Sequence, residues 1–506
     1  MADHGIDPGF ATLPHRRLAD AALSRARDLG VEHADFRFER VRYQNLTTRD
    51  GRLQGAEDTE DLGFAVRVVH RGAWGFASGV VLSTDEAVIT VERAVAVAQV
   101  AAEMTRIPVR LAPEPVHSDV TWISAYDVDP LSVPLAAKSE LLCDWSGRLL
   151  AADGVEHASS SLQQVQEIKF YADLAGTTTT QQRVRLQPFV ECYGTRGDRF
   201  DSMATIAPPV GRGWEYVAGD PSQGAWDFDA ELAELPELLA EKLAAPSVTA
   251  GRYDLVIHPS NLWLTIHESI GHATELDRAL GYEANYAGTS FATPDQLGTL
   301  RYGSPLMHVT GDRTVPHGLA TIGFDDDGVA TQSWDIVRDG VLVGYQLDRA
   351  TAAAYSDSGR SNGCAYADSP GHIPIQRMAN VSLQPAVDGP DTEGLIAEVE
   401  RGIYVVGDKS WSIDMQRFNF QFTGQRFYAI EDGRLAGQVR DVAYQATTTD
   451  FWGSMTAVGG PQTYQLGGAF NCGKAQPGQV AAVSHGCPSA LFRDIRVLNA
   501  VEEGDA

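Results

Sequence analysis

Apolar residues recur at helical spacing near the N-terminus and then alternate with polar residues at strand spacing. In residues 16–29 the apolar residues recur at helical spacing, and Gly30 follows where a helix would end; these residues are Leu18, Ala21, Ala22, Leu23 and Ala26. The segments ADFRFERVRY, GFAVRVVH and AWGFAS alternate as strands do, and Asp50-Gly51 predicts the hairpin turn after the first of them. The pattern predicts an opening helix followed by an antiparallel sheet.

Helices and strands alternate through the rest of the first half. Residues 85–104 form a second amphipathic pattern, which begins after the capping pair Ser83 and Thr84. A third helix is predicted at about 134–152, and strands follow around 155–206. Together these elements indicate a mixed α+β first domain.

A domain boundary is predicted near residues 207–228, because this stretch is rich in Pro and Gly and has no period. We therefore expect an N-terminal α+β domain at 1–225 and a C-terminal domain at 226–506. A helix containing Pro236 is expected at about 229–245, followed by the short apolar strand YDLVI and a helix from about 260.

The second domain is expected to be mainly antiparallel β after residue 300. Asp327-Gly328, Asp339-Gly340 and Asp432-Gly433 each lie between alternating runs and predict tight turns. The acidic triplet 325–327 lacks the full spacing of a calcium loop, so a hairpin tip is the better interpretation. The fold class is therefore α+β in two domains.

Charge and cysteine content narrow the functional classes. The net charge of −27 disfavours binding to nucleic acid or to an anionic membrane. Five widely spaced cysteines do not form a disulfide framework and suit a reducing compartment. No signal peptide and no run of roughly 18 apolar residues is evident, so the cytoplasm is the expected location.

Candidate chemistry is concentrated in the sequence His-Glu-Ser-Ile-Gly-His, which begins at His267 and ends at His272. The familiar zinc-peptidase pattern has two histidines four residues apart, with a Glu beside the first. Here they are five apart, which in an ideal α-helix turns the side chains roughly 140° from each other. One extra residue in a turn would realign them, as would a break at Gly271. We therefore predict a local departure from α-helical geometry at 268–272.

The surroundings of this motif favour a metal over ordinary core histidines. An apolar helix, WLTIHESIGHATELD, suddenly carries several titratable groups, which are costly to bury unless they bind a cation or one another. Glu275 and Asp277 could accept hydrogen bonds from the imidazole N–H groups. Exposure of both on an outer face is the alternative.

A catalytic zinc needs three protein ligands and an open position, so a third ligand must come from elsewhere in the chain. Cys472, in the glycine-rich segment GGAFNCGKAQPGQ, is one candidate, and His485 and Cys487 are its rivals. Chemistry alone does not choose between the two cysteines. The same segment resembles a phosphate-binding loop around Lys474, but Ala475 replaces the required hydroxyl residue, which disfavours nucleotide binding.

At this point the sequence resembles the TldD/PmbA family of metallopeptidases over nearly its whole length. The matching segments are HESIGHATELD, TIGFDDDGVATQSWDIVRDGVLVGYQLDR, NGCAYADSPGHIPIQRMANV, FYAIEDGRL, FNCGKAQPGQ and GVEHADFRFERVRYQNLTTRDGRL. The family contains one kind of subunit with the zinc motif and a distant cysteine, and one kind without them. This chain resembles the first kind.

The resemblance implies metal roles for His267, His272 and Cys472, and a general-base role for Glu268. It also implies a two-domain subunit that dimerises, with itself or with a TldE-like chain, around a narrow channel for peptides or unfolded polypeptides. One departure is NGCAYADSPGHIP, where the family is richer in arginine, so the family's specificity does not transfer to this chain.

The expected activity is zinc-dependent hydrolysis of short or unfolded peptides, in which Glu268 activates the water molecule that zinc binds. The alternative is a non-catalytic, zinc-containing binding or regulatory subunit of a TldD/TldE-like complex. Structural zinc usually has four protein ligands, and His485 or Cys487 could complete such a set. A hydrolase acting on non-peptide amides is a third possibility. The sequence does not distinguish endopeptidase from exopeptidase action.

Overall fold

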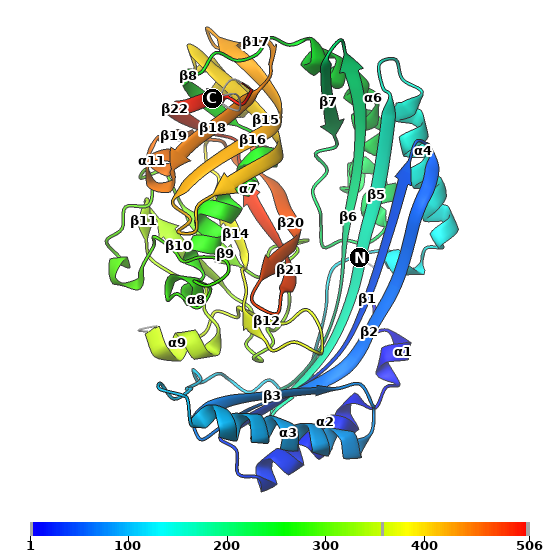
Figure 1. Ribbon diagram of the computed structural model, residues 1–506, viewed down its shortest axis with the longest axis vertical. Coiled ribbons are helices and arrows are strands. Elements are labelled where there is room, and N and C mark those ends of the chain that lie inside the picture. The colour runs from blue at the N-terminus through cyan, green and yellow to red at the C-terminus, as the bar shows by residue number, and fades with distance from the viewer. Residues whose placement is uncertain (1–3, 356–358, 502–506) are drawn as a thin grey trace.

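The structure is a computed structural model that describes residues 4–355 and 359–501. A long curved sheet from the N-terminal half forms one side of the molecule, and a more compact body from the C-terminal half faces it (Figure 1). A hairpin of β20 (Gln465–Lys474) and β21 (Gln479–Cys487) lies between them. This arrangement sets the third predicted metal ligand close to the junction of the two halves.

The N-terminal sheet has the strand order β3-β2-β1-β5-β6-β4, with β7 paired to β6. Only β4 and β6 run parallel. The strands are β1 (His33–Arg49), β2 (Arg52–His70), β3 (Ala73–Gly79), β4 (Val120–Ile123), β5 (His157–Asp173), β6 (Thr178–Arg196) and β7 (Arg199–Ala204). The predicted strands are confirmed, and Asp50-Gly51, both at positive φ, form the predicted turn between β1 and β2.

Two groups of helices cover this sheet. The first, α2 and α3, packs on Phe36, Phe38 and Phe64, whereas the second, α4 and α6, packs on the β5–β6 side around Leu162 and Leu186. The helices of this half are α1 (Pro8–Ala11), α2 (His15–Asp28), α3 (Thr84–Ala102), α4 (Leu135–Leu150), α5 (Glu215–Ala218) and α6 (Phe228–Ala244). All four helices predicted in this region are confirmed to within a few residues.

The C-terminal body is built around a second seven-stranded sheet in the order β15-β8-β22-β18-β16-β17, with β19 paired to β22. Because β15 also pairs with β16, five of these strands close into a barrel. The strands are β8 (Gly251–Ile257), β15 (Arg401–Ile413), β16 (Asn419–Glu431), β17 (Arg434–Val439), β18 (Val442–Thr447), β19 (Met455–Val458) and β22 (Ala490–Asn499). The prediction of a mainly antiparallel second half is confirmed.

Short elements surround the barrel. The strands are β9 (Val309–Asp312), β10 (Ser333–Arg338), β11 (Val341–Leu342), β12 (Ala365–Tyr366), β13 (Ile375–Gln376) and β14 (Asn380–Leu383). The helices are α7 (Pro259–Ile266), α8 (Leu276–Ala279), α9 (Arg349–Tyr355), α10 (Thr392–Ala397) and α11 (Thr448–Gly453). Asp339-Gly340 and Asp432-Gly433 connect β10 to β11 and β16 to β17, as predicted. No helix in the described part of the chain has the length and apolar character to cross a membrane.

The acidic triplet 325–327 forms a turn closed by a bridge between Phe324 and Ala330, but this turn is buried against the N-terminal sheet. Asp326 accepts a hydrogen bond from Lys169 Nζ at 2.8 Å, and Asp327 pairs with Arg67. These pairs join the two halves of the molecule. The triplet is therefore part of an interdomain contact. A hairpin tip is ordinarily exposed, so the predicted turn did not indicate this role.

More charged side chains lie buried around Lys169, and we call this group the interdomain charge cluster. Its members are Arg37, Glu39, Glu167, Lys169, Arg183, Arg185 and Asp326. Glu167 pairs with Arg183 at 2.9 Å and with Arg185 at 3.1 Å, while Lys169 lies 3.5 Å from Glu39. Cations and anions thus alternate across the junction.

The predicted domain boundary at residue 225 stays a prediction. The helix α6 follows that position, yet Phe228, Leu235 and Leu239 pack with Leu186 of β6 in the core under the N-terminal sheet. Since a domain is expected to own its core, we propose that the two bodies meet after α6, near the start of β8.

Candidate metal centre

The helix that carries the histidines begins with a well-defined cap. Pro259 occupies the first turn of α7, where its missing N–H costs nothing, and the His258 side chain accepts a hydrogen bond from Ser260 N. The helix is buried and packs on β15, β20 and β21. Its end therefore has a fixed position relative to the β20–β21 hairpin.

The backbone changes to a π-helix immediately after α7, from His267 to Gly271. The His272 N–H bonds to the His267 carbonyl, five residues back, and a short 3₁₀ turn follows. The extra residue brings the two imidazole rings together, with centroids 4.6 Å apart. The predicted departure from α-helical geometry is confirmed, and the bulge is the form it takes.

Gly271 is not the site of a break, because its φ and ψ of −53° and −60° are ordinary helical values. A Cβ at this position would lie 2.5 Å from Met378 Sδ, which is far inside contact distance. The bulge therefore packs closely against Met378 without leaving helical geometry, and the alternative of a broken helix is wrong.

Cys472 meets the two histidines from β20. Its Sγ lies 3.5 Å from His272 Nε2, and one ligand atom from each of His267, His272 and Cys472 lies within 4.8 Å of the others. Ligands on one tetrahedral zinc are separated by about 3.5 Å, given metal–ligand distances of about 2.0–2.3 Å. Two imidazoles and one sulfur form a donor set that suits zinc, so these residues fit the ion.

Hydrogen bonds fix the orientation of both imidazoles. His485 Nδ1 lies 2.8 Å from the Val381 carbonyl oxygen, which can only accept, so its Nε2 accepts from His267 Nδ1 at 2.7 Å. His272 donates from Nδ1 to Glu275 Oε2 at 2.9 Å. Each ring thus keeps the lone pair of Nε2 for the shared point beside Cys472.

Glu275 is the centre of a buried ionic network. Arg278 and Lys474 donate to it at 3.1 and 3.2 Å, and Lys474 also donates to Asp277 at 2.8 Å. Burial alone would raise the pKa of Glu275, but Lys474, His272 and Arg278 lower it well below its ordinary value. Glu275 is therefore an anionic support for His272, whereas Asp277 supports Lys474 and contacts neither imidazole.

Glu268 lies beside the histidines and is held by a cation. Arg417, in the turn between β15 and β16, donates from Nη1 to Glu268 Oε2 at 2.6 Å. Burial raises the pKa of Glu268, but the charges of His272, His267 and Arg417 outweigh burial and lower it. A hydrogen bond from the Trp411 side chain lowers the pKa further, so the carboxyl is ionised.

Two residues at this site titrate away from their ordinary ranges. Burial raises the pKa of the Cys472 thiol, but His272 and Arg377 outweigh burial and lower it overall. Burial also lowers the pKa of His267. A sulfur that loses its proton readily and a neutral imidazole are the forms that bind a metal.

The rival candidates lie close by in other positions. His485 contacts His267 through a ring nitrogen, and Cys487 Sγ lies 3.7 Å from the Pro259 carbonyl at the opposite end of α7. Sequence reasoning missed Arg417 and Arg377 entirely. It noticed Lys474 only as part of a false phosphate loop, although two carboxylates, three and five residues after His272, are buried and therefore indicate a nearby cation.

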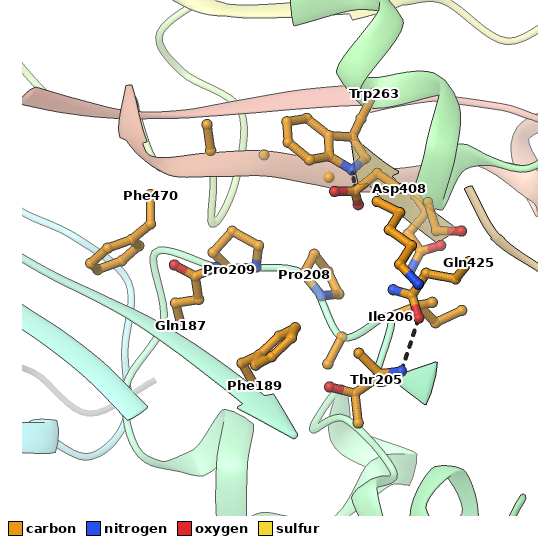
Figure 2. A pocket seen from close by; sticks show the side chains of 18 of the residues that line it. Gln187, Phe189, Thr205, Ile206, Pro208, Pro209, Trp263, Asp408, Gln425 and Phe470 are labelled. Carbon is orange, nitrogen blue, oxygen red and sulfur yellow. Dashed lines mark hydrogen bonds between the residues drawn. The ribbon is translucent and has the colours of Figure 1, made fainter. Parts of the chain in front are cut away.

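A cavity of about 330 Å³ lies between the N-terminal sheet and the edge of β20. Figure 2 shows Trp263 on one side of it and Phe189 and Pro208 on the other, with Asp408 beside the indole. Trp263 is one turn before His267 on α7, and the two rings lie 6.3 Å apart. The Trp263 indole therefore lies between the cavity and the candidate metal centre, whose ligand residues do not line the cavity.

The fold and the site define the class of this protein. It is an α+β protein with a curved N-terminal sheet facing a C-terminal barrel, and it has a buried His/His/Cys group with an adjacent glutamate. Two domain models of one family match the chain, the PmbA/TldA metallopeptidase C-terminal domain over residues 250–499 and the PmbA/TldA metallopeptidase domain 1 over residues 34–98. Together they cover more than half of the chain. The chain belongs to the PmbA/TldD family of metallopeptidases, as its sequence motifs predict.

Curated relatives span nearly the whole chain. A metalloprotease of Methanothermobacter thermautotrophicus is 27% identical, over 92% of this chain and 95% of the relative. A metalloprotease TldD homolog of Haemophilus influenzae is 25% identical, over 92% and 93%. A zinc metalloprotease TldD homolog of Saccharolobus solfataricus is 21% identical, over 94% and 98%. The relatives therefore support a peptidase family, and one of them is named for zinc.

Solved structures share the fold. A proposed modulator of a DNA gyrase from Thermotoga maritima superposes with a TM-score of 0.72 at 16% identity, over 96% of this chain and all of the other. TldE from Thermococcus kodakarensis superposes with a TM-score of 0.66 at 14% identity, over 95% and 99%. At such identities the match concerns architecture alone.

Proposed function

We propose that this chain is a zinc-dependent peptidase that hydrolyses short or unfolded peptides. The observation that carries the proposal is the convergence of His267, His272 and Cys472 on one point, with the Glu268 carboxylate next to them. Three protein ligands leave one position of a tetrahedral ion open, as in catalytic zinc sites. The names of the relatives agree with this class of activity.

The chain's own residues supply binding and proton transfer. A zinc ion bound here would polarise the scissile carbonyl and make water more acidic. Glu268, held by Arg417 through Oε2, takes the proton of the attacking water and passes it to the leaving amine. Arg417 adds a positive charge beside the reacting carbonyl, where negative charge develops.

The cavity beside the metal centre suits an extended peptide. Residues 465–470 of β20 line it, and in the described part of the chain β20 pairs only with β21, so the other edge of β20 is available to a substrate strand. Main-chain pairing of this kind gives affinity with little dependence on sequence. The aromatic lining adds apolar contact area.

A non-catalytic zinc-containing subunit is the second candidate. It would be favoured by a fourth protein ligand, but His485 points a ring nitrogen at His267 and Cys487 lies at the far end of α7. Both rivals are occupied with other partners. The observed positions therefore favour catalysis.

We further propose that the chain dimerises, either with itself or with a TldE-like chain, because TldE shares this architecture. Cytoplasmic location stays a prediction from the sequence. The five cysteines, all free in the structure, agree with a reducing compartment.

Metal analysis and peptide digestion test the proposal together. Purified wild-type protein should hold one zinc per chain, and His267→Ala and Cys472→Ala should each lose it. Zinc-loaded Glu268→Ala should keep the metal and lose cleavage of unfolded peptides. Unchanged cleavage by Glu268→Ala would refute the base assignment, and a wild-type protein that binds zinc without cleaving any peptide would favour the regulatory alternative.

A further inference from the structure

Two carboxylates line the cavity, and one of them is that of Asp408 on β15. It accepts a hydrogen bond from Trp263 Nε1 at 3.1 Å. No Lys, Arg or His nitrogen of the described residues lies within ion-pair distance of it. The nearest cation in sequence, Lys409, also lines the cavity but pairs with Asp201 at 2.6 Å. Asp408 therefore brings a carboxylate without an ion-pair partner to the cavity wall.

The environment of Asp408 is aromatic. Trp263 and Trp411 line the cavity with it, and Figure 2 shows the carboxylate next to the Trp263 indole. Burial raises the pKa of Asp408 to about 6, so the group is ionised at neutral pH. A half-buried anion beside indole rings favours an organic cation, which can pair with the carboxylate and stack on the aromatic faces.

The other carboxylate of the cavity, that of Glu191, has a different hydrogen-bond partner. Glu191 lines the same cavity, is half-buried like Asp408 and likewise has no ion pair among the described residues, but it accepts a hydrogen bond from the Tyr193 hydroxyl at 2.5 Å. Asp408 lies on the strand that also carries Trp411, and it bonds to a second indole, that of Trp263. Of the two carboxylates, Asp408 has the environment of a cation-binding group.

We propose that this cavity is a specificity subsite that takes an arginine or lysine side chain of the peptide substrate, with Asp408 as the anion that binds it. The proposal rests on the peptidase function proposed above. Trp263 links the subsite to the metal centre, because it lies one turn before His267, and β20 runs from the cavity at residues 465–470 to Cys472. The net charge of −27 also attracts basic peptides over longer distances.

The test uses zinc-loaded protein and N-acetylated peptides that differ at one position, where arginine, glutamine or glutamate is placed in turn. Acetylation removes the terminal amine, so that only a side chain can supply the cation. At one position arginine should raise kcat/KM over glutamine by about 10-fold, which corresponds to about 1.4 kcal/mol. Asp408→Asn should lose this preference, and Asp408→Lys should favour glutamate. Glu191→Gln, the matched control in the same cavity, should keep the arginine preference.

A binding measurement separates this proposal from the peptidase proposal. In Glu268→Gln, fluorescence anisotropy should detect tighter binding of the arginine peptide than of the glutamine peptide, and Asp408→Asn in that background should remove the difference. Cleavage by the wild type without any preference for basic residues would overturn the subsite, as would a preference that persists in a zinc-replete Asp408→Asn. If the wild type cleaves nothing but the binding difference depends on Asp408, the peptidase proposal is wrong and the subsite stands.

Discussion

The metal centre and the interdomain charge cluster both bury many polar side chains, but they differ in what balances the burial. In the cluster, Lys169 lies between Glu39 and Asp326, and Glu167 lies between two arginines. Each charge there has an opposite charge from the protein itself. Such pairing offsets the desolvation of most of these ions, with Glu39 as the exception, and the cluster is held together by the protein's own charges.

The metal centre brings together groups of one kind. Two imidazole nitrogens and one sulfur present lone pairs to a common point, and the hydrogen bonds to His485 and Glu275 keep protons away from that point. Burying several electron-pair donors side by side costs free energy unless a cation binds to them. The comparison teaches that pairing within the protein marks a structural cluster, whereas converging donors mark a site for an ion.

The largest expected effect is a loss of catalytic rate without a loss of stability, caused by a substitution at Glu268. Glu268→Gln keeps an acceptor for Arg417 but removes the base, so kcat should fall by about 10²–10⁴-fold. Zinc content and melting temperature should stay close to the wild type. Steady-state kinetics and metal analysis of the same preparation check both expectations, and a loss of zinc in this variant would show that the glutamate acts on the metal instead.

Lys169→Met should have the opposite effect, because it should lower stability and leave zinc binding unchanged. It leaves Asp326 and Glu39 buried without their shared cation, which should lower the free energy of unfolding by about 3–5 kcal/mol. Zinc content of the folded protein should not change. The control Arg148→Met removes an exposed pair with Asp229 and should cost less than about 1 kcal/mol. Equal losses in the two variants, measured by denaturant unfolding, would contradict the assigned role of the cluster.

The cluster should also carry a pH dependence. Burial raises the pKa of Glu39 from 4.5 to about 7, against the pull of Arg37 and Lys169. The folded state therefore binds the proton of the Glu39 carboxyl more tightly than the unfolded state does. This difference adds to the free energy of unfolding below about pH 4.5, and the contribution is lost as the pH rises towards 7. Glu39→Gln should remove a stability change on the order of 2 kcal/mol over that window. Parallel slopes for the two proteins in unfolding titrations across the window would contradict this expectation.

Local patterns were sufficient for much of this structure. The alternation of β1 and β2, the helix stops and the aspartate-glycine turns are decided by neighbouring residues, and each was found where the sequence predicts it. The π-bulge was also predictable, because two histidines five residues apart can share an ion only if one residue is extra. What these features have in common is that short-range geometry determines them.

The rest depends on contacts between distant segments. Cys472 and Cys487 lie near opposite ends of the β20–β21 hairpin, which runs along α7, so one reaches His272 and the other Pro259. Their local sequences do not reveal which end faces the histidines. Arg417 reaches Glu268 from a turn 149 positions away, and nothing in that turn marks it as part of a site.

The smallest expected effect concerns the two hydrogen-bond acceptors behind the metal-binding imidazoles. One acceptor is charged and the other is neutral. His272 donates to the anion Glu275, whereas His267 donates to the neutral His485. A charged acceptor makes an imidazole a stronger electron donor than a neutral acceptor does. Glu275→Gln should therefore weaken zinc binding by about 10–100-fold, and His485→Gln by less.

Chelator competition gives the two affinities, and thermal melting with and without zinc separates them from general loss of structure. In Glu275→Gln the zinc-free protein should also melt lower than the wild type, because Lys474 and Arg278 lose their shared anion. In His485→Gln the zinc-free melting temperature should change little, since a glutamine amide can still bond to the Val381 carbonyl. Should His485→Gln weaken zinc binding more than Glu275→Gln, the orientation of the ring would matter more than the charge behind it.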